Sequence, residues 1–295
     1  MVHLGANRYG KAEVRLVRVT RGAGPSGEDL LRDWNISTSL SGDLADSHLT
    51  GSNAKVLPTD SQKNKVYALA KELGGDVEPE TFGLELGSFF VSSQEPITRA
   101  RVSVEEYGWT PIGATGYSFA RSGDLVRTTA VHVDAVLGTS VVSGLKDLTV
   151  LNTTASEFWG YPKDAYTTLP ETRDRILATS VHASWRFRPD AVAAGVDWGA
   201  AFSLAKSTIL ETFSGTYTYS LQQALLGIGT ALLAALPSVC EVRLALPNKH
   251  HYLVDLAPFG LSNEREVYLA GDRPYGLIEG TVLADDAPED GLAWD

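Results

Sequence analysis

The first 138 residues show two hydrophobic periodicities, whose order predicts two strands, two helices and two further strands. Apolar and polar residues alternate in the strand-like runs, which are rich in valine and other β-branched residues. Between them, apolar residues recur at helical spacing in residues 59–73, and a second helix is predicted to begin at Pro79. The predicted strands are residues 11–20, 30–40, 97–107 and 117–136.

Both predicted helices of this half carry an apolar face and a recognisable start. Thr59 followed by Gln62 has the form of a capping box, and Gly74-Gly75 would stop the first helix. A loop is predicted over residues 41–58. The apolar faces consist of Val66, Leu69, Ala70 and Leu73 in the first helix and of Phe82, Leu86 and Phe89 in the second.

The second half repeats this order of elements. Ser220 with Gln223 again has the form of a capping box. A repeat of about 140 residues is too long for a solenoid and favours tandem domains of one fold. We therefore predict an α+β protein with domains at 1–138 and 139–283 and an acidic tail at 284–295. The predicted strands are 143–153, 176–187, 240–256 and 266–283; the helix faces are Trp198, Phe202, Ala205, Ile209 and Phe213, then Leu221, Leu225, Ile228 and Leu232.

Composition narrows the class of protein. Hydrophobic residues make up 43% and charged residues 21% of the 295 residues, as in soluble globular proteins. The net charge of −11 argues against general nucleic-acid binding. The single cysteine, Cys240, allows no internal disulfide and no zinc site built on cysteines. With no apolar run of membrane-spanning length and no signal-peptide core, we expect a cytoplasmic protein without a membrane partner.

Residues 148–175 concentrate aromatic side chains in a segment broken by Gly160, Pro162 and Pro170. Such a segment cannot place all its rings on one helix or strand face. One interpretation is a packed connection whose rings close the end of a sheet. The other is a binding platform, with a ring that stacks on a flat ligand and an arginine in the same plane.

The order of residues in this segment resembles the signature of the uricase (urate oxidase) family. That signature runs from an apolar strand through Thr-Thr to spaced aromatic residues, a leucine and an arginine. One departure is Asn152, where the family usually has lysine. The matching residues here are Phe158, Tyr161, Tyr166, Leu169 and Arg175.

The resemblance extends from about Gly10 to Val282 and implies a fold and a reaction. It implies two tandem tunnelling-fold domains, each an antiparallel four-stranded sheet with two helices on one face, that assemble into a barrel-like homotetramer with active sites at subunit interfaces. It also implies oxidation of urate by O2 and water to 5-hydroxyisourate and hydrogen peroxide, with no cofactor.

Three residues of the first half are candidates for the chemistry. Thr59 and Asp60 lie in TDSQKN, which resembles the family's ligand-facing segment, although a threonine there is most simply a helix cap. Lys11 opens a predicted strand, where a lysine is usually solvated. The resemblance implies that Lys11 and Thr59 form a proton-abstracting dyad, which requires a lowered lysine pKa.

The remaining candidates lie in the second half. If the strand 240–256 continues unbroken, Asn248 and His250 share a face at the end of an apolar run, either as a satisfied core edge or as part of a site. LPNKH matches the family motif, which implies that His250 assists the proton relay and Asn248 holds O2 or water. The resemblance further assigns urate binding to Arg175, Gln222 and Phe158, completed by the backbone of Asp60 and Leu221.

A metal site is not expected. His132 and Asp134 share a strand face but lack companions, and no dinucleotide or phosphate-loop motif occurs. Two other functions are alternatives to urate oxidation. A non-catalytic purine-binding scaffold would lack Lys11, Thr59 or His250, and a tunnelling-fold hydrolase of pterins or purines would need Cys/His metal ligands. Sequence alone leaves open whether the two halves of the site meet within one chain, and we predict that each site is shared between two chains.

Overall fold

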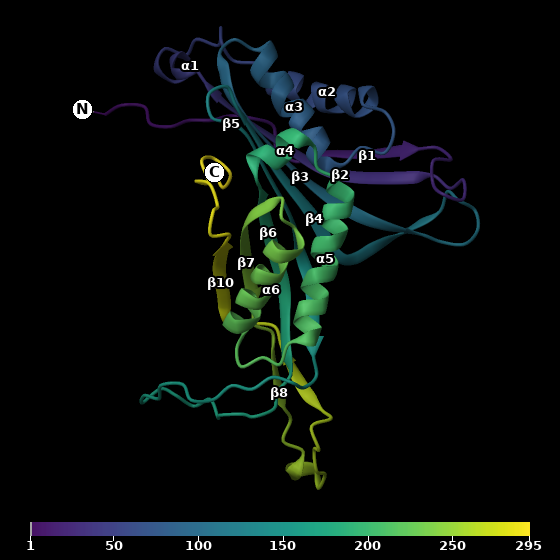
Figure 1. Ribbon diagram of the computed structural model, residues 1–295, viewed down its shortest axis with the longest axis vertical. Coiled ribbons are helices and arrows are strands. Elements are labelled where there is room, and N and C mark those ends of the chain that lie inside the picture. The colour runs from purple at the N-terminus through teal and green to yellow at the C-terminus, as the bar shows by residue number, and fades with distance from the viewer. Residues whose placement is uncertain (1) are drawn as a thin grey trace.

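The computed structural model describes residues 2–295 and contains one large antiparallel sheet (Figure 1). Its strand order is β1-β2-β3-β4-β5-β6-β7-β10, while β8 and β9 form a separate two-stranded sheet. The strands are β1 (Val14–Thr20), β2 (Leu30–Gly42), β3 (Ile97–Pro111), β4 (Phe119–Asp134), β5 (Gly138–Asn152), β6 (Leu177–Phe187), β7 (Val239–Pro247), β8 (His250–Leu253), β9 (Tyr268–Gly271) and β10 (Leu277–Leu283).

The helices follow the predicted repeat, with short additions. In each half, two long helices stand between the second and third strands of the large sheet. The loop predicted over 41–58 contains one short helix, and another short helix precedes α5. The helices are α1 (Ala45–Leu49), α2 (Thr59–Glu72), α3 (Pro79–Ser93), α4 (Pro189–Ala194), α5 (Trp198–Gly215), α6 (Leu221–Ala235) and the 3-10 helix η1 (Ala257–Phe259).

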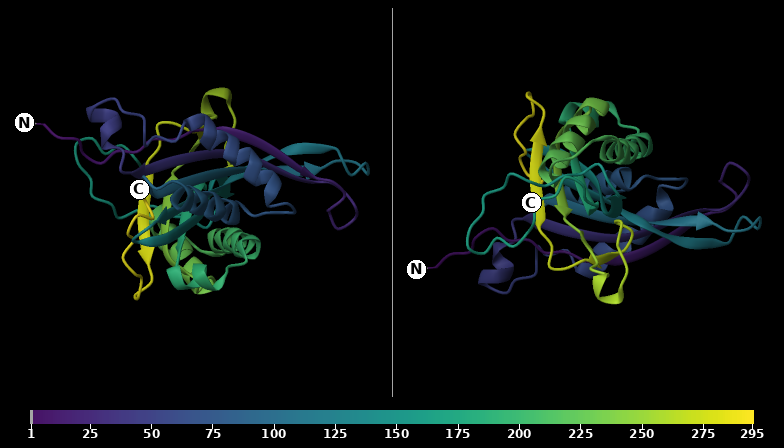
Figure 2. Two further views of the ribbon diagram at one scale, coloured as in Figure 1. Left: turned by 90° about the horizontal axis from the view of Figure 1, so that it is seen from above. Right: turned by 90° about the horizontal axis from the view of Figure 1, so that it is seen from below.

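The long helices of both halves pack on one face of the sheet (Figure 2), as their contacts with paired strand residues show. Val131 of β4 pairs with Val141 of β5, and a Cβ on Gly83 of α3 would meet Val131 at 2.7 Å. At the other end, Val282 of β10 pairs with Val242 of β7 and lies against Gly229 of α6. Glycines at these helix positions let α3 and α6 approach the sheet closely. Within residues 2–295, the other face of the sheet carries no long helix.

The two four-stranded halves join edge to edge through β4 and β5. Residues Val126–Asp134 pair with Gly138–Lys146 without interruption, so the sheet is continuous across the predicted domain boundary. Two hydrophobic cores lie under the helices: one centres on Trp34, Phe82 and Phe90, the other on Trp185 and Ile209. The sequence repeat therefore corresponds to two hydrophobic cores on one continuous sheet. The domain boundary at 138/139 stays a prediction.

The long predicted strands of the C-terminal part are each divided in two. The strand 240–256 ends at Pro247, which has no backbone N–H to donate, and the chain resumes pairing in β8. The strand 266–283 is divided into β9 and β10 by the turn at 272–276. Asn248 therefore does not share an unbroken strand face with Val242, because β7 ends before it.

Two helix predictions also need correction. Thr59 is the first helical residue of α2 and its side chain caps nothing, because Pro58 occupies the cap position and Gln62 bonds elsewhere. In α3 the buried residue of the last turn is Phe90 rather than Phe89. The second capping box is confirmed in its main bond: Ser220 Oγ accepts from the Gln223 N–H at 3.2 Å, while Gln223 reaches back to the Tyr219 N–H.

The acidic tail lies against the helix-free face of the second half. Arg186 donates to the carbonyl of Pro288 at 2.8 Å, and Arg188 pairs with Asp286 at 2.6 Å. The Trp294 ring lies 3.9 Å from the Arg243 guanidinium, and Ala293 is buried. The tail ends beside the first half of the chain, where the Asp295 carboxylate lies 3.9 Å from Arg99 of β3, and Figure 1 marks this end as C.

Candidate active site

Lys11 is held beside the sheet by backbone contacts with β2. Its N–H donates to Thr38 Oγ1 at 3.2 Å, and its carbonyl accepts from the Thr38 N–H at 2.8 Å. A Cβ on Gly10 would lie 1.8 Å from the Thr38 carbonyl oxygen, so only glycine lets the chain approach so closely there. The Lys11 side chain is half-buried and forms no ion pair within residues 2–295.

Gln62 connects Lys11 to the start of α2. This side chain is fully buried; its Oε1 accepts from the Thr38 hydroxyl at 2.8 Å, and its Nε2 donates to the Leu57 carbonyl at 3.4 Å. Because Thr38 also holds the Lys11 backbone, Thr38 fixes both the Lys11 segment and the first turn of α2. Thr59, half-buried on the first turn of α2, is thereby kept beside the Lys11 segment.

Asp60 is exposed and lies in a local positive field. Its carboxylate accepts from Lys63 at 2.6 Å and from Asn64 at 2.9 Å. The hydrogen bond and charge of Lys63 lower the pKa of Asp60 most, followed by Asn64, and Lys11 adds a smaller contribution. Asp60 thus stays ionised, and its carboxylate lies close enough to feel the charge of Lys11.

In the second half, Phe158 and Arg175 are brought together by the loop after β5. Phe158 and Thr172 exchange backbone hydrogen bonds at 2.8 and 2.9 Å. The guanidinium carbon of Arg175 lies 5.1 Å from the Phe158 ring centre, and Tyr161 stacks on that ring at 4.8 Å. A planar cation beside an aromatic ring is the arrangement that the binding-platform interpretation requires.

Ser156 orients Arg175 and was missed by the sequence analysis. It is fully buried, and its Oγ accepts from Arg175 Nε at 3.1 Å, while its carbonyl accepts from the Arg175 N–H at 3.0 Å. The two terminal nitrogens of Arg175 have no hydrogen-bond partner in the described part of the chain. Burial lowers the pKa of Arg175 from a very high ordinary value, so the guanidinium remains charged.

The start of α6 lies beside the same loop. Ser156 forms a bridge with Thr218, and the Glu157 N–H donates to the Thr218 carbonyl at 3.0 Å. Leu221 is buried on the first turn of α6, whereas Gln222 next to it is exposed. The structure therefore holds Gln222 on the same end of the molecule as Phe158 and Arg175.

Asn248 and His250 approach this group from the end of β7. Asn248 bridges to Thr179, and its N–H donates to the Gly276 carbonyl at 2.8 Å. His250 opens β8, with its ring 5.7 Å from that of Tyr252. Burial, followed by the charge of Arg175, lowers the pKa of His250, so this imidazole is neutral at pH 7 and lies within electrostatic reach of Arg175.

Asn152, the departure from the family pattern, has a structural role. Its Nδ2 donates to the carbonyl of Phe213 at 3.0 Å. Phe213 lies in the last turn of α5, where carbonyl groups lack helical partners. Asn152 thereby ties the end of β5 to the end of α5.

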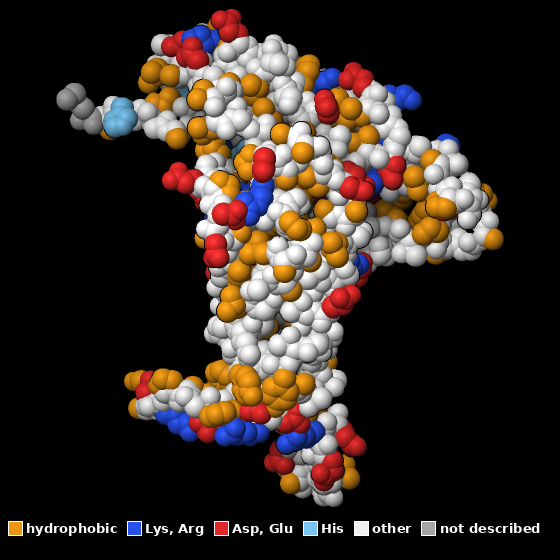
Figure 3. All heavy atoms as spheres, viewed as in Figure 1, with side chains coloured by type: hydrophobic (Ala, Val, Ile, Leu, Met, Phe, Trp, Pro, Cys, Tyr) orange, Lys and Arg blue, Asp and Glu red, His pale blue; other side chains and the backbone are white. Residues whose placement is uncertain are grey.

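The two groups of candidate residues lie at opposite ends of one chain. In Figure 1, α2, which carries Thr59 and Asp60, is at the top, whereas β8 and the loop after β5 are at the bottom, along the longest axis. Figure 3 shows that loop projecting from the lower left of the body, with hydrophobic side chains on its upper side and basic and acidic side chains on its lower side. The structure therefore assembles each group but does not bring the two groups together within the chain.

No cluster of three or more His, Cys, Asp or Glu side chains suited to a metal ion occurs within residues 2–295. Asp134, one of the two residues considered for a metal, instead accepts from Arg99 Nε at 2.8 Å. None of the helices in this part of the chain combines the length and the apolar character needed to cross a lipid bilayer.

Comparison with known proteins gives consistent matches over the chain. The family model described as Uricase matches residues 7–132 and 141–279, and the interval between them contains the predicted domain boundary. A uricase of Arthrobacter globiformis is 41% identical over 293 residues, covering 99% of this chain and 94% of that protein. A uricase of Dictyostelium discoideum is 34% identical, covering 96% of this chain and 98% of that protein.

Solved structures give the same result. The crystal structure of the Arthrobacter globiformis uricase covers 100% of this chain and 99% of its own, with a TM-score of 0.93. A uricase structure from Bacillus fastidious, 22% identical, has a TM-score of 0.80 over 95% of this chain and 94% of its own, and shows the fold alone. The match confirms the expected tunnelling fold.

Proposed function

Because this chain belongs to the uricase family, we propose that it oxidises urate with O2 and water to 5-hydroxyisourate and hydrogen peroxide. The observation that carries the proposal is the Arg175 guanidinium beside the Phe158 ring, whose terminal nitrogens have no hydrogen-bond partner among residues 2–295. That pair presents a planar cation and an aromatic surface to one point, which suits a flat, anionic heterocycle.

The second-half group would bind the substrate. Arg175 would donate two parallel hydrogen bonds to carbonyl or anionic oxygen and nitrogen atoms on one edge of urate. Gln222 would pair its amide with the complementary amide edge, and Phe158 would stack on the ring. The backbone groups of Leu221 and of Asp60 would complete these contacts.

The first-half group would carry the proton. Lys11 and Thr59 would abstract it from bound urate and relay it, with neutral His250 able to accept a proton in turn. Asn248 together with Thr59 would hold O2 or the attacking water above the ring. The Thr59 hydroxyl suits this double role, because it makes no helix-capping bond in the described part of the chain.

The electrons come from the substrate. The urate dianion formed by proton removal is electron-rich and passes two electrons to O2, which takes up two protons and leaves as hydrogen peroxide. Water adds to the oxidised purine and supplies the oxygen of 5-hydroxyisourate. The balance therefore requires no further oxidant, and we expect turnover to continue after exhaustive chelation.

Each active site would be shared between two chains. The two groups of one chain lie at opposite ends of it, so a complete site needs the Lys11 end of one subunit against the Arg175 end of another. The sheet edges β1 and β10 leave backbone groups for pairing with further copies, as closure into a barrel-like homotetramer requires. We also infer a cytoplasmic location, in keeping with the single cysteine, which is buried and free.

Complementation between two inactive variants tests this proposal. Lys11→Ala and Arg175→Ala proteins are unfolded, mixed in equal amounts and refolded, and the loss of urate absorbance in air is measured with and without a chelator. Under two-fold pairing, a mixed dimer combines both defects in one site and leaves the other site whole. With random association, roughly a quarter of all sites should be intact.

Each outcome separates the alternatives. Recovery near that fraction supports a shared site. No recovery, although mass measurement proves mixed oligomers, would mean that each site is built within a single chain. A wild-type protein that binds urate without consuming it would be a purine-binding scaffold, and activity lost on chelation and restored by metal would overturn the cofactor-free reaction.

A further inference from the structure

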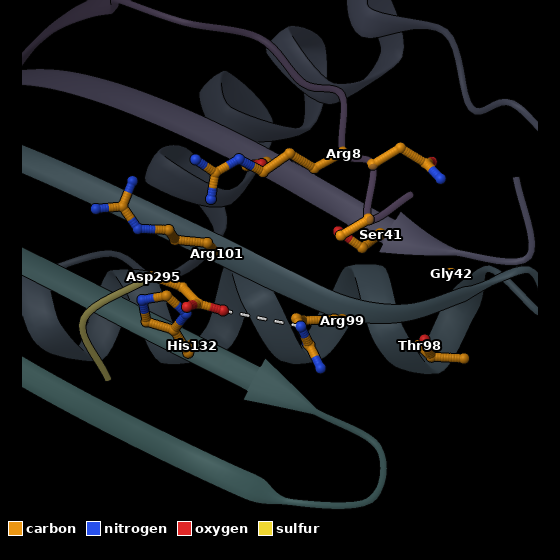
Figure 4. A pocket seen from close by; sticks show the side chains of 11 residues that line it. Arg8, Ser41, Gly42, Thr98, Arg99, Arg101, His132 and Asp295 are labelled. Carbon is orange, nitrogen blue, oxygen red and sulfur yellow. Dashed lines mark ion pairs between the residues drawn. The ribbon is translucent and has the colours of Figure 1, made fainter. Parts of the chain in front are cut away.

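A cavity of about 840 Å³ lies on the first half of the chain, and none of the nine candidate site residues lines it. Its floor is a row of side chains across three strands: Ser39 of β2 pairs with Arg101 of β3, which pairs with His132 of β4. The N-terminal segment contributes Arg8, and the tail contributes Asp295 (Figure 4).

The positive charge of this cavity is only partly neutralised. Arg99 at its edge donates to Asp134 at 2.8 Å and lies 3.9 Å from the Asp295 carboxylate. Neither Arg8 nor Arg101 has an ion-pair partner within residues 2–295. Burial and then the charge of Arg8 lower the pKa of Arg101, and the smaller effect of the Asp295 carboxylate offsets this only in part, so the two guanidiniums repel each other across the cavity.

Buried polar atoms without partners point to a missing ligand. His132 is only 2% exposed, yet its Nε2 has no hydrogen-bond partner in the described chain, and neither has Arg101 Nε. Leaving buried polar atoms unpaired is costly, and native proteins rarely do so without a bound ion or water. Burial, followed by the charge of Arg101, lowers the pKa of His132 to about 4, so it is neutral at pH 7 and can offer one N–H.

We propose that this cavity binds a multiply charged oxyanion of the phosphate class between Arg8, Arg101 and His132. The two guanidiniums supply planar, bidentate donors and the imidazole supplies a single N–H, which together match a tetrahedral oxyanion. The Asp295 carboxylate enters the same cavity and competes with that anion for the arginines. The cavity is larger than inorganic phosphate alone, so the phosphate of a nucleotide is a second source of the same chemistry.

Calorimetric titration of the full chain with inorganic phosphate, at constant ionic strength and pH 7, tests the proposal without urate. Phosphate should bind saturably, whereas chloride at equal ionic strength should give no saturable heat. Arg8→Gln and Arg101→Gln should each weaken phosphate binding about tenfold or more, because each removes a charge-assisted contact. Asp295→Asn should strengthen it by removing the competing charge.

Arg21→Gln is the matched control, because it removes one positive charge from an exposed turn residue paired with Asp29. It should bind phosphate like the wild type.

A second titration with a nucleoside monophosphate identifies the source of the phosphate group. Tighter, Arg101-dependent binding would assign the site to a nucleotide phosphate, and equal binding would assign it to the free anion. Arg8 is exposed, so its variant should fold even if that of Arg101 does not. Phosphate binding that is absent, or unchanged in Arg8→Gln, would overturn the proposal whether or not the protein oxidises urate.

Discussion

The two groups of candidate residues differ in how firmly the chain holds them. In the second half, side chains contact one another: Arg175 is bonded to Ser156, lies beside Phe158 and lowers the pKa of His250. In the first half, Lys11 is held only through its backbone, and neither its ammonium nor the Thr59 hydroxyl has a hydrogen-bond partner within residues 2–295. The second-half group is therefore preorganised for binding, whereas the polar ends of Lys11 and Thr59 are left for the substrate to engage.

The largest effect should come from the unengaged group. Lys11→Ala should lower kcat by about 10²–10⁴-fold with little change in KM, because a proton-transfer group acts in the transition state. Steady-state urate oxidation measures both constants. Lys71→Ala, an exposed lysine on α2, is the control and should behave like the wild type. A change in KM alone in Lys11→Ala would refute the division of roles.

The preorganised group should respond through binding. Arg175→Ala should raise KM about 10–100-fold, because a charge-assisted contact to bound substrate contributes roughly 1.5–3 kcal/mol. The control is Arg173→Ala, whose exposed guanidinium lies on the Trp159 ring instead. Comparable KM increases in both variants would mean that general positive charge, rather than the Arg175 geometry, attracts the substrate.

Ser156→Ala should have the same kind of effect as Arg175→Ala, but smaller. Removing the Oγ acceptor frees the Arg175 head, and a lost hydrogen bond of about 1 kcal/mol corresponds to roughly a fivefold rise in KM. Thr154→Ala in the same loop, which loses only an exposed bond to Asp174, should leave KM unchanged. If Ser156→Ala lowers kcat and leaves KM intact, Ser156 does not act through Arg175.

The pH profile tests the link between His250 and Arg175. The folded-state pKa of His250 lies below its ordinary value, so activity that depends on the neutral imidazole falls as pH falls through that lowered pKa. Arg175→Gln removes one cause of the lowering, so the acid limb of kcat should move to higher pH. An unmoved limb in Arg175→Gln, measured at saturating urate, would separate the two residues.

Several features were predictable from sequence because they depend on neighbours along the chain. Hydrophobic periodicity located the long helices and the strands β1 to β6, and Ser220 with Gln223 marked the start of α6. The composition of residues 148–175 left open a packed connection or a binding platform, and the family resemblance singled out Phe158 and Arg175, which the structure places side by side. Ser156 was not predicted. Its only sequence signal is its position as a small polar residue two places before Phe158, and its bond to Arg175 depends on the fold of the loop.

Other features depend on contacts between distant residues, and local pattern misplaced them. Thr59 with Gln62 has the form of a capping box, yet Gln62 bonds to Thr38, 24 residues earlier, because a buried amide must satisfy its polar atoms within the core. Asn248 and His250 alternate correctly for one strand, yet Pro247 ends β7 and their backbone pairs with different strands.

The sequence by itself determined the long helices and most strands through their hydrophobic periodicity, and its resemblance to a known family pointed to the family and to the candidate site residues. Only the tertiary structure decided that Lys11 and Arg175 stand at opposite ends of one molecule, and that Arg8, Arg101 and His132 meet in one cavity. The reason is that strand pairing joins residues far apart in the sequence, such as Ser39 with Arg101 and Arg101 with His132, and no local periodicity records which strands become neighbours.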